Sequence, residues 1–422
     1  MLRRLHTHGQ RHALRRLEHA MHSDRWLLVH PQHTLEPAPR DALRTKMLLA
    51  VLGLGALHTT LSLDNDVPPL WTTDAGPGLV LLSPTKPSIL IVNDNLPTNV
   101  NGVVTFLANM ERHASAYSVS YLNPSQFPHI DCPGYPDIKL SLPFRLVSKL
   151  RSHRPDFIHI ATEGPLGLAT RLYCDLNRIP YNSAYHTRIP EYMEVVFGVP
   201  EAIGYAYLRW FHRNSAAVLT TTDTMVHELR RRGFKSLIQP MKFGVDRRLF
   251  RPTIRRARET TTAHGPILLS VGRVSKEKGL DAFCDLDYPG ATKIVVGDGP
   301  YRSELEARYP EIQFVGLQTG EALAEYYANA DVLVFTSRTD TFGLVMIESL
   351  ACGTPVAAFP VPGPLDAIEC GVTGHLSEDL RASIDVCLGL DRAAVATASE
   401  VWSWEHCWAT FEKHLVRSNL SE

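Results

Sequence analysis

Two carboxylates in the second half of the chain, Asp340 and Glu348, stand eight residues apart across the start of an expected helix. The surrounding run, 339–356, lies between two apolar strands. Four successive backbone amides would form the N-terminus of its helix, and they belong to Phe342, Gly343, Leu344 and Val345. Such amides favour phosphate or sugar oxygens. The two carboxylates could then accept hydrogen bonds from two sets of hydroxyls, one on a sugar and one on a ribose. The alternative is a helix cap and a surface glutamate.

Two cations lie in another loop, after the expected strand 267–271. Gly272 permits a close backbone approach, Arg273 emerges at the carboxyl edge of the sheet, and we expect Lys278 at the start of the following helix. Two cations there suit a diphosphate leaving group, whose negative charge grows as its bond to carbon breaks. A solvated basic loop is the alternative. The turn 297–300, Gly-Asp-Gly-Pro, is a weak signal, because glycine-rich turns close many strand–helix units.

Short apolar strands that alternate with helices must position these loops. The expected strands of the first half are 89–92, 156–160, 181–185 and 216–220, with helices at 103–110 and 166–176. Those of the second half are 267–271, 293–297, 312–315, 332–335 and 355–358. Continuous apolar strands alternating with helices indicate parallel sheets that are buried on both faces. The sequence therefore predicts an α/β protein with two doubly wound domains, in which ligands bind beyond the carboxyl ends of the strands.

Composition narrows the class of protein. The 422 residues are 44% hydrophobic and 21% charged, which is typical of a folded chain of two to three domains. The net charge of -1 gives no basic excess that would indicate nucleic-acid binding. Seven cysteines without metal-binding spacing favour reduced core thiols in a cytoplasmic protein.

The near-neutral charge is an average over unlike parts. Residues 88–250 carry 18 Lys and Arg against 13 Asp and Glu, whereas residues 251–422 carry 15 against 24. A basic first domain and an acidic second domain fit a protein whose first domain faces a membrane.

Residues 1–87 form a poorly defined extension, rich in Arg and His at its start and then interrupted by prolines. It could be a basic amphipathic helix on anionic lipid, a loosely ordered extension, or sequence upstream of the true start. Its apolar run 47–57 is too short for a bilayer span, which needs about 20 residues. We interpret 64–66, Asp-Asn-Asp, as a coincidental likeness to a DxD metal motif.

The run 270–356 resembles the C-terminal half of the GT4 family of retaining glycosyltransferases, which share the GT-B fold. It is especially similar to bacterial α-mannosyltransferases and sulfolipid synthases that glycosylate lipids, and 362–366 also resembles that branch. The family's E-x7-E motif falls on Asp340 and Glu348, with Asp in place of the first Glu. The resemblance implies that Arg273 and Lys278 bind the nucleotide diphosphate, that Glu348 binds ribose and that Asp340 contacts the sugar.

The first half resembles the same family. Residues 99–104 are similar to its glycine loop, where Gly102 lets the backbone approach the phosphates, and 159–167 are similar to a second stretch. Residues 185–192 carry His186, which in the family meets the donor sugar across the cleft. The resemblance implies two Rossmann-like domains that face a central cleft, an acceptor-side domain at 88–250 and a nucleotide-sugar domain at 251–422. The last helix would be able to pack back on the first domain.

The implied activity is transfer of a hexose, with retention, from a nucleotide diphosphate sugar to a lipid or glycan. GDP-mannose is the favoured donor and a UDP-sugar the second, and no metal or other cofactor is required. The implied catalytic residues are His186, Arg273, Lys278 and Asp340. The implied donor-binding residues are Gly102, Arg273, Lys278, Asp340, Phe342, Gly343, Leu344, Val345 and Glu348.

Two other readings stay open: another GT-B enzyme, such as a sugar-nucleotide epimerase or a phosphorylase, and a non-catalytic nucleotide-sugar-binding protein. Turnover without acceptor would favour an epimerase. A phosphorylase would need a pyridoxal phosphate lysine, for which no local motif is present. Donor binding without turnover on many acceptors would favour the non-catalytic protein.

Three segments of the first domain mix cations with apolar residues: 144–151, 208–213 and 229–235. Such segments suit a cytoplasmic protein that contacts anionic lipid on the inner face of a membrane. Ordinary solvated helices are the alternative.

Overall fold

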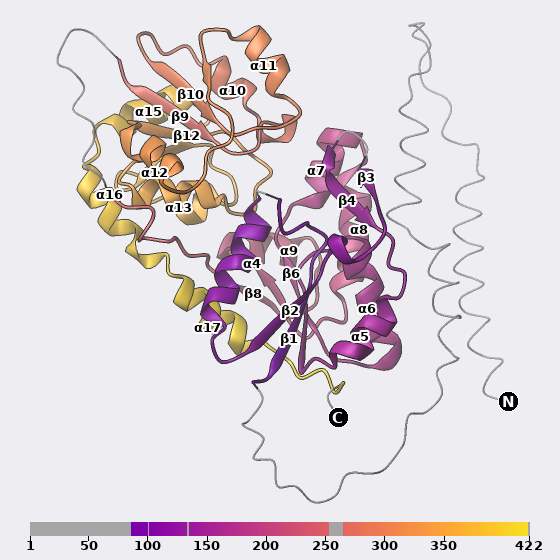
Figure 1. The fold of residues 1–422 in the computed structure, drawn as a ribbon. Coiled ribbons are helices and arrows are strands. Elements are labelled where there is room, and N and C mark those ends of the chain that lie inside the picture. Colours follow the sequence, from indigo (N-terminus) through magenta and orange to yellow (C-terminus); the bar gives the residue numbers. More distant parts are fainter. Residues whose placement is uncertain (1–85, 100, 133–134, 253–264, 421–422) are drawn as a thin grey trace, which may run out of the picture. The chain divides into compact units, whose positions relative to one another are not determined.

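The computed structural model describes residues 86–99, 101–132, 135–252 and 265–420 (Figure 1). The extension up to residue 85, with the apolar run 47–57 and the segment 64–66, lies outside the described residues. Within the described ranges, no helix is both long and apolar enough to cross a bilayer.

The first six-stranded sheet is parallel, with the order β2-β1-β5-β6-β7-β8. Its strands are β1 (Ser88–Val92), β2 (Ser118–Leu122), β5 (Phe157–Ile160), β6 (Asn182–Tyr185), β7 (Val218–Thr220) and β8 (Ile238–Pro240). Its helices are α4 (Gly102–His113), α5 (Leu146–His153), α6 (Pro165–Asn177), α7 (Ile189–Phe197), α8 (Glu201–His212) and α9 (Asp223–Arg231), with a 3-10 turn at Pro124–Gln126.

The inner strand β1 explains why the sheet is covered on both faces. Ile89 and Ile91 pack with Phe106 of α4, whereas Leu90 and Val92 pack with Leu150 of α5 and with residues of α6. Alternate side chains of a strand point to opposite faces, so an unbroken apolar run requires a layer of helices on each side.

The second sheet repeats this arrangement, with the order β11-β10-β9-β12-β13-β14, all parallel. Its strands are β9 (Ile267–Val271), β10 (Thr292–Val296), β11 (Gln313–Phe314), β12 (Val332–Phe335), β13 (Val356–Ala358) and β14 (Gly374–Leu376). Its helices are α10 (Asp281–Cys284), α11 (Arg302–Arg308), α12 (Gly320–Asn329), α13 (Leu344–Ala351), α14 (Pro364–Ala367), α15 (Leu380–Leu388) and α16 (Arg392–Ala398), followed by a 3-10 turn at Ser399–Val401. Both sheets have the doubly wound strand order, which confirms the predicted fold class.

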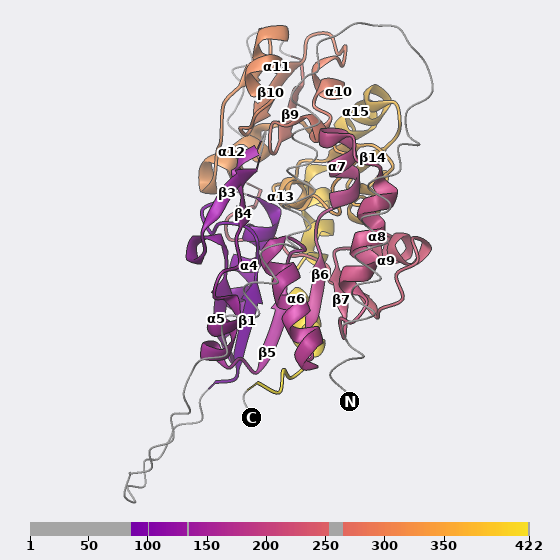
Figure 2. The ribbon, with the colours of Figure 1, turned by 90° about the vertical axis from the view of Figure 1, so that its right-hand side faces the viewer.

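The last helix, α17 (Trp404–Lys413), packs against α4 of the first sheet (Figure 1; Figure 2 gives the view turned by 90°). Beyond it, the Ser418 amide donates to the Asp156 carbonyl over 2.8 Å, next to the start of β5. One hydrophobic core therefore contains residues of both sheets, among them Phe106, Phe342 and Trp404.

An antiparallel hairpin, β3 (His129–Cys132) and β4 (Tyr135–Ser141), was not predicted from the sequence. His129, Ile130 and Asp131 are exposed, so β3 shows no buried apolar run. The edge strand β2 was missed as well, because only its last residue is fully buried.

All seven cysteines are free thiols, and six of them are buried, as expected for core fillers. Cys370 is the exception and lies exposed, just before β14.

Candidate active site

The structure places the predicted residues at the carboxyl edges of the two sheets. Gly102 begins α4 after the loop that leaves β1, and His186 directly follows β6. In the second sheet, Arg273 follows β9 and Asp340 lies in the loop between β12 and α13. The loops after β1, β9 and β12 flank the points at which the strand order reverses, where open α/β sheets bind ligands, and the loop after β6 lies one strand further along the first sheet.

Lys278 and Asp340 form an ion pair through Nζ and Oδ1. Lys278 does not start a helix as predicted: it ends the 3-10 turn Lys276–Lys278, and α10 begins only at Asp281. The cause is Gly279, whose φ of 64° lies in the left-handed region and ends the turn. Lys278 therefore contributes its own charge to this region, without the free amides of a helix N-terminus.

The loop that carries Arg273 is supported by the turn 297–300. Gly297 has φ 141°, and a Cβ there would stand 1.8 Å from the Gly272 carbonyl oxygen, so only glycine allows this approach. The Val274 amide donates to the Asp298 carbonyl over 2.9 Å. The Gly-Asp-Gly-Pro turn, a weak signal in the sequence, thus shapes the loop of the predicted diphosphate-binding arginine.

Helix α13 begins at Leu344, with Gly343 as its N-cap at φ 92°, so the amides predicted for the helix N-terminus do lie there. The ring of Phe342 is 1% exposed and packs on Phe243 and Trp402, with ring centres 5.5 and 5.2 Å away. The Phe342 side chain is therefore part of the core, and only its backbone amide is left to contact a nucleotide-sugar donor. The half-buried Leu344 and Val345 pack partly against the same core.

Glu348 lies on α13 with a partner that the sequence did not reveal. The Tyr327 hydroxyl of α12 donates to Glu348 Oε2 over 2.9 Å. Burial raises the pKa of Glu348 to about 7, although the bond from Tyr327 opposes that rise. Tyr327 itself is fully buried, and its pKa lies well above the usual value, so its hydroxyl stays a donor.

His186 presents an unsatisfied, neutral imidazole. It is 8% exposed, it packs 4.7 Å from the ring of Phe106, and among the described residues neither ring nitrogen has a hydrogen-bond partner. Burial, and to a smaller extent His159, lowers the pKa of His186 to about 3. A neutral imidazole of this kind can donate to or accept from a ligand hydroxyl, but it carries no charge near neutral pH.

Residues of both sheets meet around the loop 338–341. The Thr341 hydroxyl donates to the His186 carbonyl over 2.5 Å, and the Thr341 carbonyl accepts from the Thr221 hydroxyl over 2.9 Å. Arg188 donates to the Arg338 carbonyl over 3.0 Å. These bonds bring His186 beside the loop that holds Asp340.

The glycine loop also approaches the second sheet. A Cβ on Gly102 would lie 3.9 Å from Leu344 Cδ1, which places Gly102 against the first residue of α13. Gly102, His186, Lys278 and Asp340 therefore border one region, while Arg273 and Glu348 lie on its neighbouring elements.

A half-buried acid, Asp94, organises the loop after β1 and was not singled out from the sequence. It accepts from the Leu166 and Gly167 amides at 2.8 and 3.3 Å and from the Thr162 hydroxyl at 2.8 Å. Burial raises its pKa to about 6, against the effect of these bonds. The only sequence signal was an aspartate two residues after an apolar strand.

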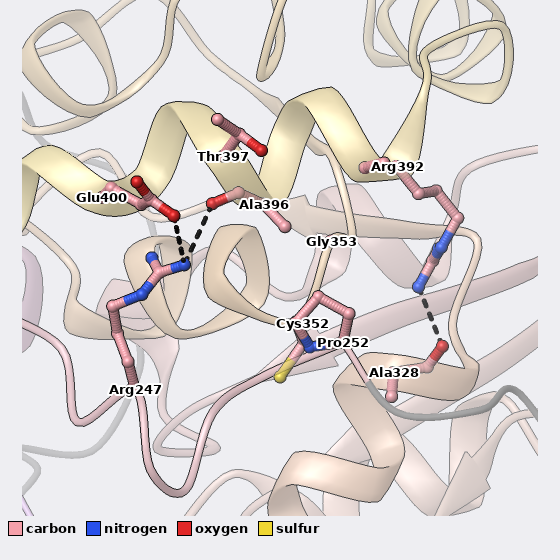
Figure 3. A pocket seen from close by; sticks show the side chains of 10 residues that line it. Arg247, Pro252, Ala328, Cys352, Gly353, Arg392, Ala396, Thr397 and Glu400 are labelled. Carbon is pink, nitrogen blue, oxygen red and sulfur yellow. Dashed lines mark hydrogen bonds and ion pairs between the residues drawn. The ribbon is translucent and has the colours of Figure 1, made fainter.

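A cavity of about 450 Å³ opens elsewhere, at the C-terminal end of α13 (Figure 3). Arg247 reaches across it to the Ser399 hydroxyl at 2.7 Å and to Glu400 at 3.5 Å, and Cys352 lines another wall. None of the predicted site residues lines this cavity. Its position does not coincide with the loops at the carboxyl edges of the strands.

Within the described ranges, no group of three or more His, Cys, Asp or Glu side chains is arranged to hold a metal ion.

Two family models match the chain, and together they cover more than half of it. Residues 102–248 match the model described as Glycosyltransferase Family 4, and residues 265–390 match Glycosyl transferases group 1. The predicted site residues all lie within these two matches.

Curated relatives point to the same family. A GDP-mannose-dependent alpha-mannosyltransferase of Mycobacterium tuberculosis is 32% identical over 251 residues, 58% of this chain and 66% of the relative. Sulfoquinovosyl transferase SQD2 of Arabidopsis thaliana is 28% identical over 277 residues, 62% of this chain and 54% of the relative. The chain thus spans between about half and two thirds of the length of these relatives.

Two solved structures share the fold at low sequence identity. Sucrose-phosphate synthase from Thermosynechococcus elongatus has a TM-score of 0.62 and 21% identity, covering 78% of this chain and 98% of that one. Anabaena HepE, solved with UDP and glucose, has a TM-score of 0.58 and 18% identity, covering 77% and 98%.

Proposed function

The chain belongs to glycosyltransferase family 4 and has the GT-B fold, and from that premise we propose that it transfers a hexose from a nucleotide diphosphate sugar to an acceptor hydroxyl with retention at the anomeric carbon. The observation that carries the proposal is the meeting of residues from both sheets around loop 338–341. There the backbone of His186 meets the loop that carries Asp340 of the Lys278–Asp340 ion pair and leads into α13, and the neutral imidazole of His186 has no hydrogen-bond partner among the described residues.

Each group has a distinct part in binding the donor. Arg273 and Lys278 bind the diphosphate, and the free amides at the start of α13 donate further hydrogen bonds to the diphosphate oxygens. Glu348, in its ionised form, accepts from the ribose hydroxyls. Asp340 and His186 orient the hexose from opposite sides, because one belongs to the second domain and the other to the first.

Transfer breaks the bond between the anomeric carbon and the phosphate oxygen and forms a bond from that carbon to the acceptor oxygen on the same face. The acceptor proton passes to the departing phosphate oxygen, so no enzymic nucleophile is used. Catalysis is positioning together with electrostatic stabilisation of the leaving diphosphate by Arg273 and Lys278. Because side chains supply these positive charges, we propose that no metal ion is required.

For the donor we propose GDP-mannose, with a UDP-sugar as the second choice. The relatives named for GDP-mannose support this choice. The direct test is a thermal-shift screen of the full chain with GDP-mannose, UDP-glucose and other nucleotide sugars, followed by turnover assays with the donor that stabilises it most. A rise in melting temperature with GDP-mannose above that with UDP-sugars would support the choice, and the reverse order would refute it.

The turnover assay also separates hexose transfer from the competing activities. Consumption of donor that depends on an acceptor supports transfer, whereas isomerised nucleotide sugar formed without acceptor would identify an epimerase. Donor binding with no turnover on a broad acceptor panel would identify a non-catalytic binding protein.

For the acceptor we propose a lipid, reached by peripheral contact of the first domain with an anionic membrane. Phe144, just before α5, is 45% exposed, and Arg145, Arg151 and Arg154 are exposed at or beyond the same helix. Exposed aromatic and basic side chains together suit an anionic lipid surface. Flotation with phosphatidylglycerol vesicles tests the contact: binding at low salt that weakens at high salt is expected, and absence of binding at both would refute it.

A further inference from the structure

We propose that Thr341 is a positioning residue, which holds His186 and Asp340 at the separation that transfer requires. This inference rests on the proposed function. Thr341 follows Asp340 directly in the chain, is 5% exposed, and is hydrogen-bonded to the first domain through both its side chain and its backbone.

The first bond joins the two sugar-orienting residues. The Thr341 hydroxyl donates to the carbonyl of His186. The donor of this bond is one residue from Asp340, and its acceptor belongs to His186 itself. A shift of loop 338–341 away from His186 would therefore directly change the distance between the His186 imidazole and the Asp340 carboxylate.

The second bond fixes the threonine from the other side. The hydroxyl of Thr221, which directly follows β7 and is 1% exposed, donates to the Thr341 carbonyl over 2.9 Å. Thr341 is therefore a donor to the loop after β6 and an acceptor from the loop after β7. Two hydrogen bonds to loops that leave adjacent strands of one sheet fix the position of Thr341 more closely than either bond alone.

Two neighbouring contacts extend the same link. Arg188 donates to the Arg338 carbonyl over 3.0 Å, and the Thr224 amide donates to Asp366 Oδ1 over 3.1 Å. Neither contact reaches Asp340 or His186 as directly as Thr341 does. Removing the Arg188 or Asp366 side chain would also remove a charge. The hydroxyls of Thr341 and Thr221 can each be removed without changing the charge of the protein.

Arg273 and Glu348, which bind the nucleotide in the proposed function, take no part in this link, and Lys278 is joined to it only through its ion pair with Asp340. All three belong to the second domain, so their contacts with the donor do not depend directly on the Thr341 hydroxyl. Sugar orientation depends on His186 across the cleft. Loss of the hydroxyl is therefore expected to lower kcat much more than it raises the donor KM.

The test compares Thr341→Val with Thr341→Ser. Valine keeps the branched shape but removes the hydroxyl, and we expect kcat to fall about 10- to 100-fold, since a misplacement of about 1 Å can cost that much. The donor KM should stay within about threefold of the wild type. Serine keeps the hydroxyl and should restore most of kcat.

Thr220→Val is the matched control. Thr220 is fully buried, and its hydroxyl donates to the Tyr185 carbonyl over 3.1 Å. Thr220 directly precedes Thr221, and Tyr185 directly precedes His186, but this bond lies within the first domain. We expect this variant to lose stability as Thr341→Val does and yet to keep its kcat. Thr221→Val should lower kcat, and the Thr221→Val, Thr341→Val double variant should lose less than the product of the two single effects. If Thr341→Val does not fold, Thr221→Val carries the test.

Amide hydrogen exchange gives a readout that does not depend on turnover. In Thr341→Val, amides of residues 186–189 and 338–342 should exchange faster than in Thr220→Val. Equal kcat in Thr341→Val and the wild type, no recovery with serine, or equal exchange in Thr341→Val and Thr220→Val would each overturn the role of Thr341. A wild-type protein that transfers no hexose from any donor would instead refute the proposed function, and the exchange comparison would still decide whether Thr341 holds the two loops together.

Discussion

Replacing Tyr327 by Phe tests the proposed ribose contact through the charge of Glu348. The change removes the hydroxyl that donates to Glu348 Oε2 over 2.9 Å but keeps the ring, which packs edge-on against Phe250 with centres 5.8 Å apart. Burial alone then acts on the carboxyl. The pKa of Glu348, which is about 7 in the wild type, should therefore rise further.

The size of the effect follows from the strength of this bond. A hydrogen bond to a charged group contributes about 1.5–3 kcal/mol, and one pKa unit corresponds to about 1.4 kcal/mol, so the pKa should rise by about one to two units. At pH 7 the ionised fraction would fall from about one half to about 1–10%. Because we propose that the ribose binds the carboxylate, the donor KM at pH 7 should rise about 5- to 50-fold.

The sign of the pH dependence makes the prediction specific. Donor affinity should weaken as the pH falls through the pKa of Glu348, and it should recover in Tyr327→Phe as the pH rises above about 9. Initial-rate kinetics from pH 6 to 9.5 measure this, with Tyr288→Phe as the control, since it removes a tyrosine–carboxylate bond of 2.7 Å at the exposed Asp385. An increase in KM by the same factor at every pH would refute the reasoning.

The remaining predictions concern the diphosphate, metal and packing. Arg273→Ala should lower kcat/KM about 10²- to 10³-fold in a protein that still folds, whereas the nearby exposed Lys276→Ala should be nearly neutral; full activity of a folded Arg273→Ala enzyme would contradict the diphosphate contact. Transfer should persist in excess EDTA, and its loss, with recovery on adding a divalent cation, would show a metal requirement. Gly167→Ala should destabilise the fold by about 1–3 kcal/mol in urea unfolding, because its Cβ would stand 1.9 Å from the Thr162 carbonyl oxygen; an unchanged midpoint would contradict this close packing.

The sequence predicted the two sheets because their central strands are continuous apolar runs, which few other structures accommodate. It also predicted that the candidate residues lie on loops at the carboxyl edges of the sheets, since parallel strands end at a common edge. The hairpin β3–β4 was missed, because its exposed residues form no such run. The start of a helix at Lys278 was wrong, because the left-handed Gly279 ends a 3-10 turn there.

The partners of the site residues were beyond sequence reasoning for a different reason. Tyr327 lies 21 residues before Glu348, and Thr341 meets a carbonyl 155 residues away. Neither contact follows from a local period or motif, because each depends on how separate helices and sheets pack. Phe342 was predicted at the right place, but the role of its ring in the core became visible only through Phe243 and Trp402.

The return of α17 to the first sheet has a consequence for the order in which the two domains complete their fold during synthesis. Ile89, Ile91 and Phe106 belong to the same core as Phe411, and the ring of His159 packs 4.9 Å from that of Phe411. During synthesis, the strands and helices of the first domain leave the ribosome long before residues 404–413 exist. Part of the face formed by β1 and β5 therefore stays uncovered until α17 has been made, so the first domain is completed only after the second domain has been synthesised.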